Sequence, residues 1–176
     1  MRVLKFFLYG LLALLVLVVA VGFVLPSKYH VERSLEVKAP AEKVFALVND
    51  PKQWATWAVW NKRDPGMKVA YSGAAEGVGA KWAWESKTEG SGEMEFTRSE
   101  PPKLVGYKLF FPDFGTTATG TLVFVPAGDG TRITWTNDGD MGGNPLLHYM
   151  ALAMDSLVGP DFEAGLWGLK ARAEAP

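Results

Sequence analysis

Side chains that could carry acid–base or metal chemistry are few in this chain. It has no Cys and only two His, His30 and His148, which excludes thiol catalysis, Cys-ligated metal sites and a His-rich zinc site with three protein ligands. Asp138 and Asp140 are close in sequence, but no alternating set of oxygen ligands surrounds them, as a calcium loop would need. We therefore predict neither a metal nor a cofactor, and a general-base role for His148 is a minor alternative.

Motifs that activate a nucleophile or bind a nucleotide are also missing. There is no Gly-x-Ser-x-Gly, and Gly77-x-Gly79 is not completed by a third Gly. Asp64, between Arg63 and Pro65, is typical of a turn in which the carboxylate accepts backbone N–H bonds. An enzyme would depend on carboxylates that strand alternation places toward solvent, namely Glu85, Glu93 and Glu95.

The prominent feature is aromatic: 7 Trp, 10 Phe and 5 Tyr in 176 residues. A mostly apolar pocket with few polar groups suits a hydrophobic ligand, and Met side chains adapt to varied ligand shapes. The expected lining residues are Trp57, Trp82, Trp84, Met94, Phe96, Tyr107, Leu122, Phe124, Trp135, Met150, Met154 and Val158. The alternative is that these side chains fill a dry core. Tyr71, Tyr107, Asn137 and Tyr149 could orient a ligand, although buried Tyr and Asn usually serve structure.

These side chains depend on a predicted antiparallel sheet. Alternating apolar residues and turn signals every ten or so positions predict seven strands, over residues 30–37, 68–71, 81–86, 93–98, 105–111, 117–125 and 131–137. Gly128-Asp129-Gly130, between two apolar runs, predicts a hairpin.

Helical patterns flank the strands. The spacing of Ala41, Val44, Phe45 and Val48 predicts a helix that ends at residues 49–51, and a second short helix follows over 51–57. Asn144 and Pro145 start a long helix, in which Gly159-Pro160 predicts a kink. Its apolar stripe is Leu147, Met150, Met154, Val158, Phe162, Gly165 and Leu169. The expected fold is α+β: a curved seven-stranded antiparallel sheet gripping a long C-terminal helix, with two short helices after the first strand.

An apolar segment, residues 6–25, precedes this domain and contains no charged residue. A helix of that length spans roughly 30 Å, the thickness of the hydrocarbon core of a bilayer. We expect a transmembrane anchor over residues 1–26 and a ligand-binding domain over 27–176. A cleaved signal peptide and a buried helix are the alternatives. The short N-terminal tail before this segment favours a cytoplasmic N-terminus and a domain outside, in the periplasm if the protein is bacterial.

The composition excludes other classes. A net charge of −1 argues against nucleic-acid binding, and the hydrophobic fraction of 48% excludes a disordered chain. The oligomeric state stays open.

Several short motifs, in order, resemble those of the START-like superfamily, also called SRPBCC or helix-grip, and within it the polyketide cyclase/dehydrase and lipid-transport group. They are residues 37–45 (VKAPAEKVF), 57–65 (WAVWNKRDP), 71–73 (YSG), 77–80 (GVGA), 84–85 (WE) and 159–166 (GPDFEAGL). Ala58-Val59 stands where the family usually has a Pro between two Trp. The resemblance covers about residues 30–172.

The resemblance implies a hydrophobic cavity between sheet and long helix, and little about chemistry. Our main hypothesis is a membrane-anchored module that binds a hydrophobic small molecule or lipid. The alternatives are an enzyme of the cyclase, dehydratase or hydrolase type acting on a hydrophobic substrate, and a ligand-free interaction module.

Overall fold

The sheet forms one layer of the domain. The structure, a computed structural model, describes residues 2–176. Seven strands form one antiparallel sheet in the order β1-β7-β6-β5-β4-β3-β2. Their bounds are β1 Lys28–Val37, β2 Lys68–Gly73, β3 Ala80–Ser86, β4 Gly90–Glu100, β5 Leu104–Phe111, β6 Thr116–Ala127 and β7 Gly130–Asp140. The seven predicted strands and their antiparallel pairing are confirmed.

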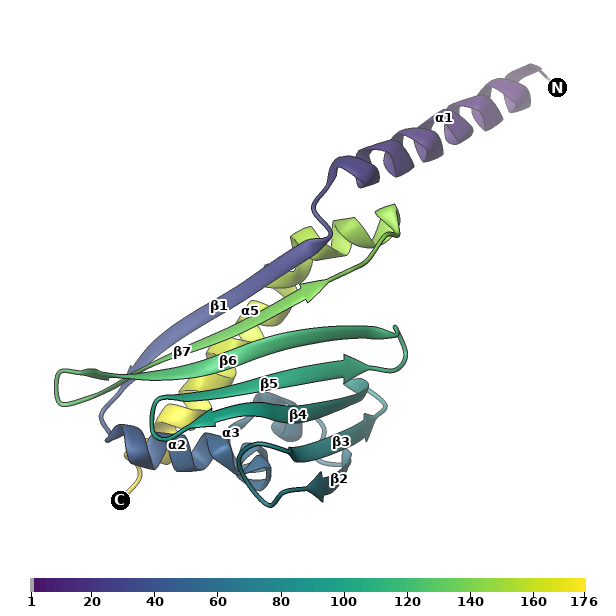
Figure 1. The fold of residues 1–176 in the computed structure, drawn as a ribbon. Helices are drawn as coiled ribbons and strands as arrows, with labels where there is room; N and C mark the ends of the chain where they lie inside the picture. Colours follow the sequence, from purple (N-terminus) through teal and green to yellow (C-terminus); the bar gives the residue numbers. More distant parts are fainter. Residues whose placement is uncertain (1) are drawn as a thin grey trace.

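Helices form the second layer. The sheet wraps around the long helix α5 (Pro145–Glu174), and α2 (Ala41–Asn49) and α3 (Trp54–Trp57) close one end (Figure 1). The N-terminus of α5 is capped as predicted, because the side chain of Asn144 accepts a hydrogen bond of 3.0 Å from the Leu146 N–H.

The short helices differ in detail from the prediction. The segment predicted as one helix over residues 51–57 is a 3₁₀ turn, η1 (Pro51–Gln53), followed by α3. A further helix, α4 (Val59–Arg63), was not predicted; it is a single short turn with no apolar periodicity to reveal it. α5 continues through Pro160 as one helix, and the predicted kink at Gly159-Pro160 stays a prediction.

The two faces of the sheet have the predicted polarity. Trp82, Met94, Phe96, Leu122 and Trp135 are buried on the inner face. Lys81, Glu85, Glu93 and Arg132 are exposed, while Glu95 and Thr134 are partly exposed. The register shifts between Phe96 and Arg98, a bulge that adds local twist to β4.

Helix α1 (Arg2–Val24) extends away from the domain at the end where β1 begins (Figure 1). Nearly all of its side chains are exposed. It is long and apolar enough to cross a membrane, a test that a signal sequence also passes. The last turns of α1 contact the first turns of α5.

Candidate functional site

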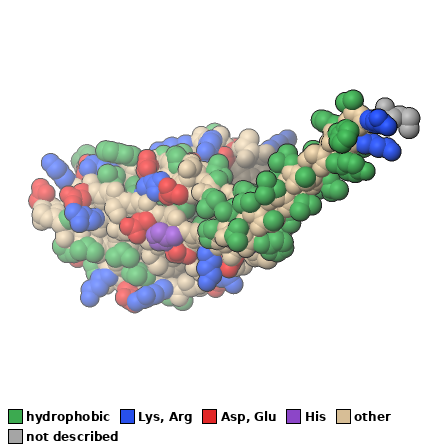
Figure 2. All heavy atoms as spheres, turned by 90° about the horizontal axis from the view of Figure 1, so that it is seen from above, with side chains coloured by type: hydrophobic (Ala, Val, Ile, Leu, Met, Phe, Trp, Pro, Cys, Tyr) green, Lys and Arg blue, Asp and Glu red, His purple; other side chains and the backbone are tan. Residues whose placement is uncertain are grey.

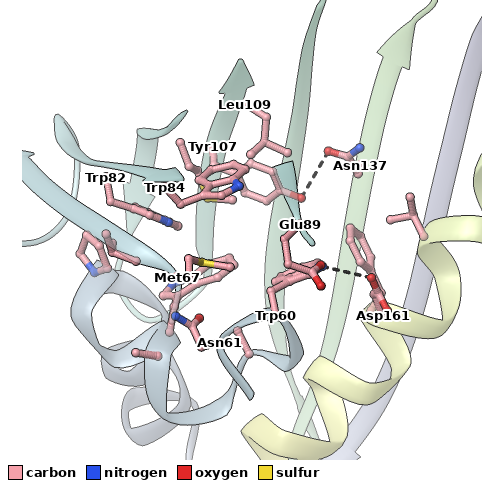
Figure 3. A pocket seen from close by; sticks show the side chains of 18 of the residues that line it. Trp60, Asn61, Met67, Trp82, Trp84, Glu89, Tyr107, Leu109, Asn137 and Asp161 are labelled. Atoms are coloured by element: carbon pink, nitrogen blue, oxygen red, sulfur yellow. Dashed lines mark hydrogen bonds between the residues drawn. The ribbon is translucent and has the colours of Figure 1, made fainter. Parts of the chain in front are cut away.

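A cavity of about 240 Å³ lies between the inner face of the sheet and α5. The strands contribute Trp82, Trp84, Met94, Tyr107, Leu109 and Trp135 to its wall. The helical side contributes Trp54, Trp60, Met154, Val158 and Phe162. Figure 3 shows how the side chains from both layers converge on this space. The wall is therefore mostly aromatic and thioether surface, which suits an apolar ligand.

Aromatic contacts join the two layers within the cavity wall. The ring centroids of Trp135 and Phe162 are 4.1 Å apart, with 13° between their planes. The Trp54 ring meets Trp135 edge to face at 5.6 Å. Such pairs add to the free energy gained by burial alone. The wall is thus held by contacts that link β7, α3 and α5.

Tyr107 is the most deeply buried polar group of the wall. Its hydroxyl donates to the Thr136 carbonyl at 2.9 Å and accepts from the Trp135 indole N–H at 2.9 Å. Burial raises the pKa of Tyr107 far above its usual range, so it stays neutral. In residues 2–176 no buried side-chain polar atom lacks a hydrogen-bond partner. The Tyr107 hydroxyl is therefore already committed to the protein.

The carboxylates of Glu89 and Asp161 also line the cavity. Both form ion pairs with the guanidinium of Arg63. Arg63 Nε lies 2.9 Å from Glu89 Oε1, and Arg63 Nη2 lies 2.7 Å from Asp161 Oδ2. The Trp60 indole N–H donates to Asp161 at 3.0 Å (Figure 3). The hydrogen bond to Asp161 is the main cause of the raised pKa of Arg63. Arg63 therefore connects α4, the β3–β4 turn and α5 at the cavity wall.

The predicted lining residues fall into three groups. Seven lie in the cavity wall: Trp82, Trp84, Met94, Tyr107, Trp135, Met154 and Val158. Trp57, Phe96, Leu122 and Phe124 are buried in the core and lie outside the lining set. Met150 is exposed on α5. Binding of a ligand by any of them stays a prediction.

The polar residues that could orient a ligand do not all lie in the cavity wall. Tyr71, Tyr107 and Asn137 line the cavity, whereas the Tyr149 hydroxyl donates to the Val18 carbonyl of α1 at 2.8 Å. His148 contacts the Gly22 and Gly142 carbonyl oxygens at 2.7 and 2.8 Å, which is a structural role.

The acidic residues considered for chemistry lie elsewhere. Glu85, Glu93 and Glu95 are outside the cavity wall. Asp64 forms the predicted turn, accepting the Gly66 N–H at 2.9 Å, and also accepts the Ser86 hydroxyl at 2.6 Å. In residues 2–176 no group of three or more His, Asp or Glu side chains is arranged to hold a metal.

Sequence reasoning missed Trp60, Glu89 and Asp161. Trp60 lies on the unpredicted α4, although Trp54, Trp57 and Trp60 recur every three residues and could have indicated a shared face. Glu89 lies in the turn between β3 and β4, and a Glu followed by a Gly indicates a turn and not a cavity wall. Asp161 had no signal beyond its place in the Gly-Pro-Asp-Phe motif, because its partner Arg63 is distant in sequence.

Solved structures share this fold at low sequence identity. Protein CV1439 from Chromobacterium violaceum has a TM-score of 0.62 and 18% identity, over 84% of this chain and 98% of that one. Norcoclaurine synthase from Thalictrum flavum has a TM-score of 0.63 and 16% identity, over 83% and 94%.

A third similar structure is a two-domain protein. The di-domain aromatase/cyclase StfQ of the steffimycin biosynthetic pathway has a TM-score of 0.65 and 15% identity over 84% of this chain, which spans about half (51%) of StfQ. These likenesses show the fold alone.

No curated protein has a matching sequence. The family model described as polyketide cyclase / dehydrase and lipid transport matches residues 28–174, which is nearly the whole domain after α1. Together with the helix-grip architecture, this match shows that the chain belongs to the polyketide cyclase/dehydrase and lipid-transport family of the START-like superfamily.

Proposed function

We propose that this protein is a membrane-anchored module that binds one compact hydrophobic molecule between its sheet and α5. The observation that carries the proposal is the cavity of about 240 Å³ walled by Trp, Met and Phe side chains. Burial of apolar ligand surface there supplies the driving force, at roughly 25 cal/mol per Å².

The size of the cavity limits the ligand. Pockets for small molecules usually measure about 300–1,000 Å³, and this one, at about 240 Å³, is slightly smaller. A single acyl chain or a small ring system fits that space better than a two-chain phospholipid. Among lipids, we therefore favour a single-chain species.

Anchoring is the second part of the proposal. α1 is apolar and exposed along nearly all of its length, and an exposed helix of this kind is stable in hydrocarbon rather than in water. Gly22 of α1 is buried against Pro145 of α5, which supports a retained helix, since its end has a specific place on the domain. We place the domain outside, with the N-terminus in the cytoplasm.

An enzyme of the cyclase or dehydratase type is the second candidate, and one observation favours it. Glu89 and Asp161 both line the cavity, and carboxylates at an apolar pocket can act as acid or base. Against this, both already pair with Arg63, so a proton transfer would first have to break an ion pair.

Native mass spectrometry of the full chain, released from detergent micelles straight after purification, tests the proposal. We expect a reproducible extra mass in the range of a single-chain lipid or a comparable small molecule. Val158→Phe should fill part of the cavity and reduce that adduct several-fold. The matched control is Val125→Phe, at an exposed position of β6, which should retain it.

A fluorescent fatty acid, dansyl-undecanoate, gives a second readout. Energy transfer from the Trp side chains of the wall should report its uptake by the wild-type chain and by Val125→Phe, and much less by Val158→Phe. Absence of both the adduct and the uptake in a folded protein would overturn the binding proposal. If the protein converts a hydrophobic substrate and loses this activity in Glu89→Gln and in Asp161→Asn, the enzyme is favoured instead.

A further inference from the structure

The first turns of α5 are fixed against the last turns of α1. His148 Nδ1 lies 2.7 Å from the Gly22 carbonyl oxygen, and the Tyr149 hydroxyl donates to the Val18 carbonyl at 2.8 Å. Pro145 packs directly on Gly22, where a Cβ would have no room. Val18 and Val24 are separated by roughly 9 Å along the axis at 1.5 Å per residue. The start of α5 therefore lies beside the end of α1 and not beyond it.

The depth of α5 in the bilayer follows from that position. This step rests on the proposed anchoring of α1. If residues 6–25 span the hydrocarbon core, Gly22 and Val18 lie roughly 5 and 10 Å inside its outer edge at 1.5 Å per residue, below the adjoining headgroups. The α5 turns that touch them must then reach the boundary between acyl chains and headgroups. Side chains at that boundary contact lipid wherever the protein does not cover them.

The side chains at this position suit lipid. Residues 144–154 contain no Asp, Glu, Lys or Arg. Leu146, Met150 and Leu157 are 48%, 43% and 59% exposed, and at 100° per residue they fall within about 40° of one another on the helix. They form a continuous outward stripe. The first acidic side chain after residue 154, Asp155, is paired with Arg33 at 2.7 Å.

A loop at the same end of the domain adds a further apolar group. Phe114, in the β5–β6 turn, is 74% exposed. The register Ala118↔Gly139 brings the start of β6 beside the end of β7, from which the chain enters α5. Figure 1 shows this turn at the end of the sheet nearest α1. Figure 2 shows hydrophobic side chains along α1 and around its junction with the domain, while charged side chains are mostly farther away.

We propose that the end of this apolar face nearest α1, made of Leu146, Met150 and Phe114, rests in the interfacial layer of the bilayer that α1 spans. Its occupant is lipid, because the face continues from the surface of a helix proposed to lie in lipid. Met154 and Val158, which follow on the same helix, line the cavity. The apolar face thus borders the cavity wall along α5.

Single cysteines test this placement, since the chain has none of its own. Leu146→Cys, Met150→Cys and Phe114→Cys are labelled with the fluorophore NBD in the full chain, in phosphatidylcholine/phosphatidylglycerol nanodiscs. Quenching by lipids spin-labelled near the headgroup is compared with quenching by aqueous iodide. The control is Val78→Cys. Val78 is 59% exposed, between Phe114 and Leu146, but it lies in the β2–β3 loop, at the end of the sheet opposite the β5–β6 turn.

We expect lipid quenching to be several-fold stronger at positions 114, 146 and 150 than at 78, with iodide quenching in the reverse order. Iodide access equal to that of position 78 would overturn the inference. So would protection from both quenchers, because it would indicate a second protein copy on the apolar face.

Leu12→Cys, within α1, separates this inference from the anchoring on which it rests. Its quenching by lipids spin-labelled deep in the acyl chain supports the span independently. If lipid quenches the label at position 12 while iodide reaches positions 146 and 150, only the membrane contact of the domain is refuted. An unquenched position 12 refutes the anchoring itself.

Discussion

The indole ring of Trp84 packs against Gly92, its cross-strand partner in β4. A Cβ at Gly92 would come within 2.8 Å of Trp84 Cε2 and closer still to other ring atoms. Gly92 therefore gives this Trp its position, and because Trp84 lines the cavity, Gly92 also shapes the cavity without touching it.

Gly92→Ala should displace the Trp84 ring. We expect the free energy of unfolding to fall by about 1–3 kcal/mol, the usual cost of overpacking, together with a change in uptake of dansyl-undecanoate. Thermal unfolding and the uptake assay measure the two effects. Gly143→Ala is the control, since a Cβ there meets no atom within 4 Å. A Gly92→Ala protein with wild-type behaviour in both assays would contradict the proposed role of Gly92.

Truncation of the stacked pair in the cavity wall should lower the free energy of unfolding. Phe162 is buried and stacks on Trp135, so Phe162→Ala removes a large side chain from the contact between sheet and α5. We expect a loss of about 3–5 kcal/mol, measured by denaturant unfolding in micelles. Val125→Ala, at an exposed site, should change stability by no more than about 0.5 kcal/mol. Equal effects of the two substitutions would show that the stack contributes little.

Arg63 should control how fast a ligand leaves. It links α4, the β3–β4 turn and α5 through Glu89 and Asp161, so Arg63→Gln loosens three elements of the wall at once. We expect release of dansyl-undecanoate, followed by stopped-flow fluorescence, to be several-fold faster. Lys62→Gln makes the same change of charge at the neighbouring exposed residue and should leave the rate unchanged. If both variants release the ligand equally fast, net charge and not the Arg63 contacts sets the rate.

His30 should titrate above its ordinary pKa of 6.5. Its Nδ1 lies 2.7 Å from Asp138 Oδ1 across the β1–β7 pair, and this hydrogen bond raises the pKa. A raised pKa means that the interaction stabilises the fold below about pH 6.5 and that this contribution is lost as the pH rises through the folded-state pKa. Asp138→Asn should return the pKa toward 6.5.

NMR of the imidazole resonances in micelles measures this titration. The chain has two His, and His30→Gln assigns the signals. An unchanged titration of His30 in Asp138→Asn would exclude Asp138 as the cause.

The fold could be predicted largely because alternation and turns are local signals. β6 and β7 (Thr116–Ala127 and Gly130–Asp140) alternate clearly around Gly128-Asp129-Gly130, and the cap at Asn144 marks the start of α5. α4 could not be predicted, because its five residues are too few to show a helical period.

The site was only partly predictable, because alternation tells which face of a strand a residue occupies and not how far along the curved sheet it lies. Phe124 and Trp135 both point inward. Phe124 packs edge to face on Phe45 of α2, at 6.0 Å, whereas Trp135 reaches the cavity. The contacts of Arg63 depend on partners from distant segments, so no local pattern could reveal them.

The connection between α1 and β1 determines how the molecule bears force. Only residues 25–27 separate the two elements, and β1 then pairs with β7 along its whole length, from Lys28↔Asp140 to Val37↔Thr131. Hydrogen bonds between antiparallel strands run perpendicular to the strands, and β1 continues in nearly the direction of α1 (Figure 1). A pull along α1 therefore loads this ladder in shear, so the bonds share the tension and are not peeled apart one by one. A load applied through α1 thus enters the domain at a strand pair that resists mechanical unfolding.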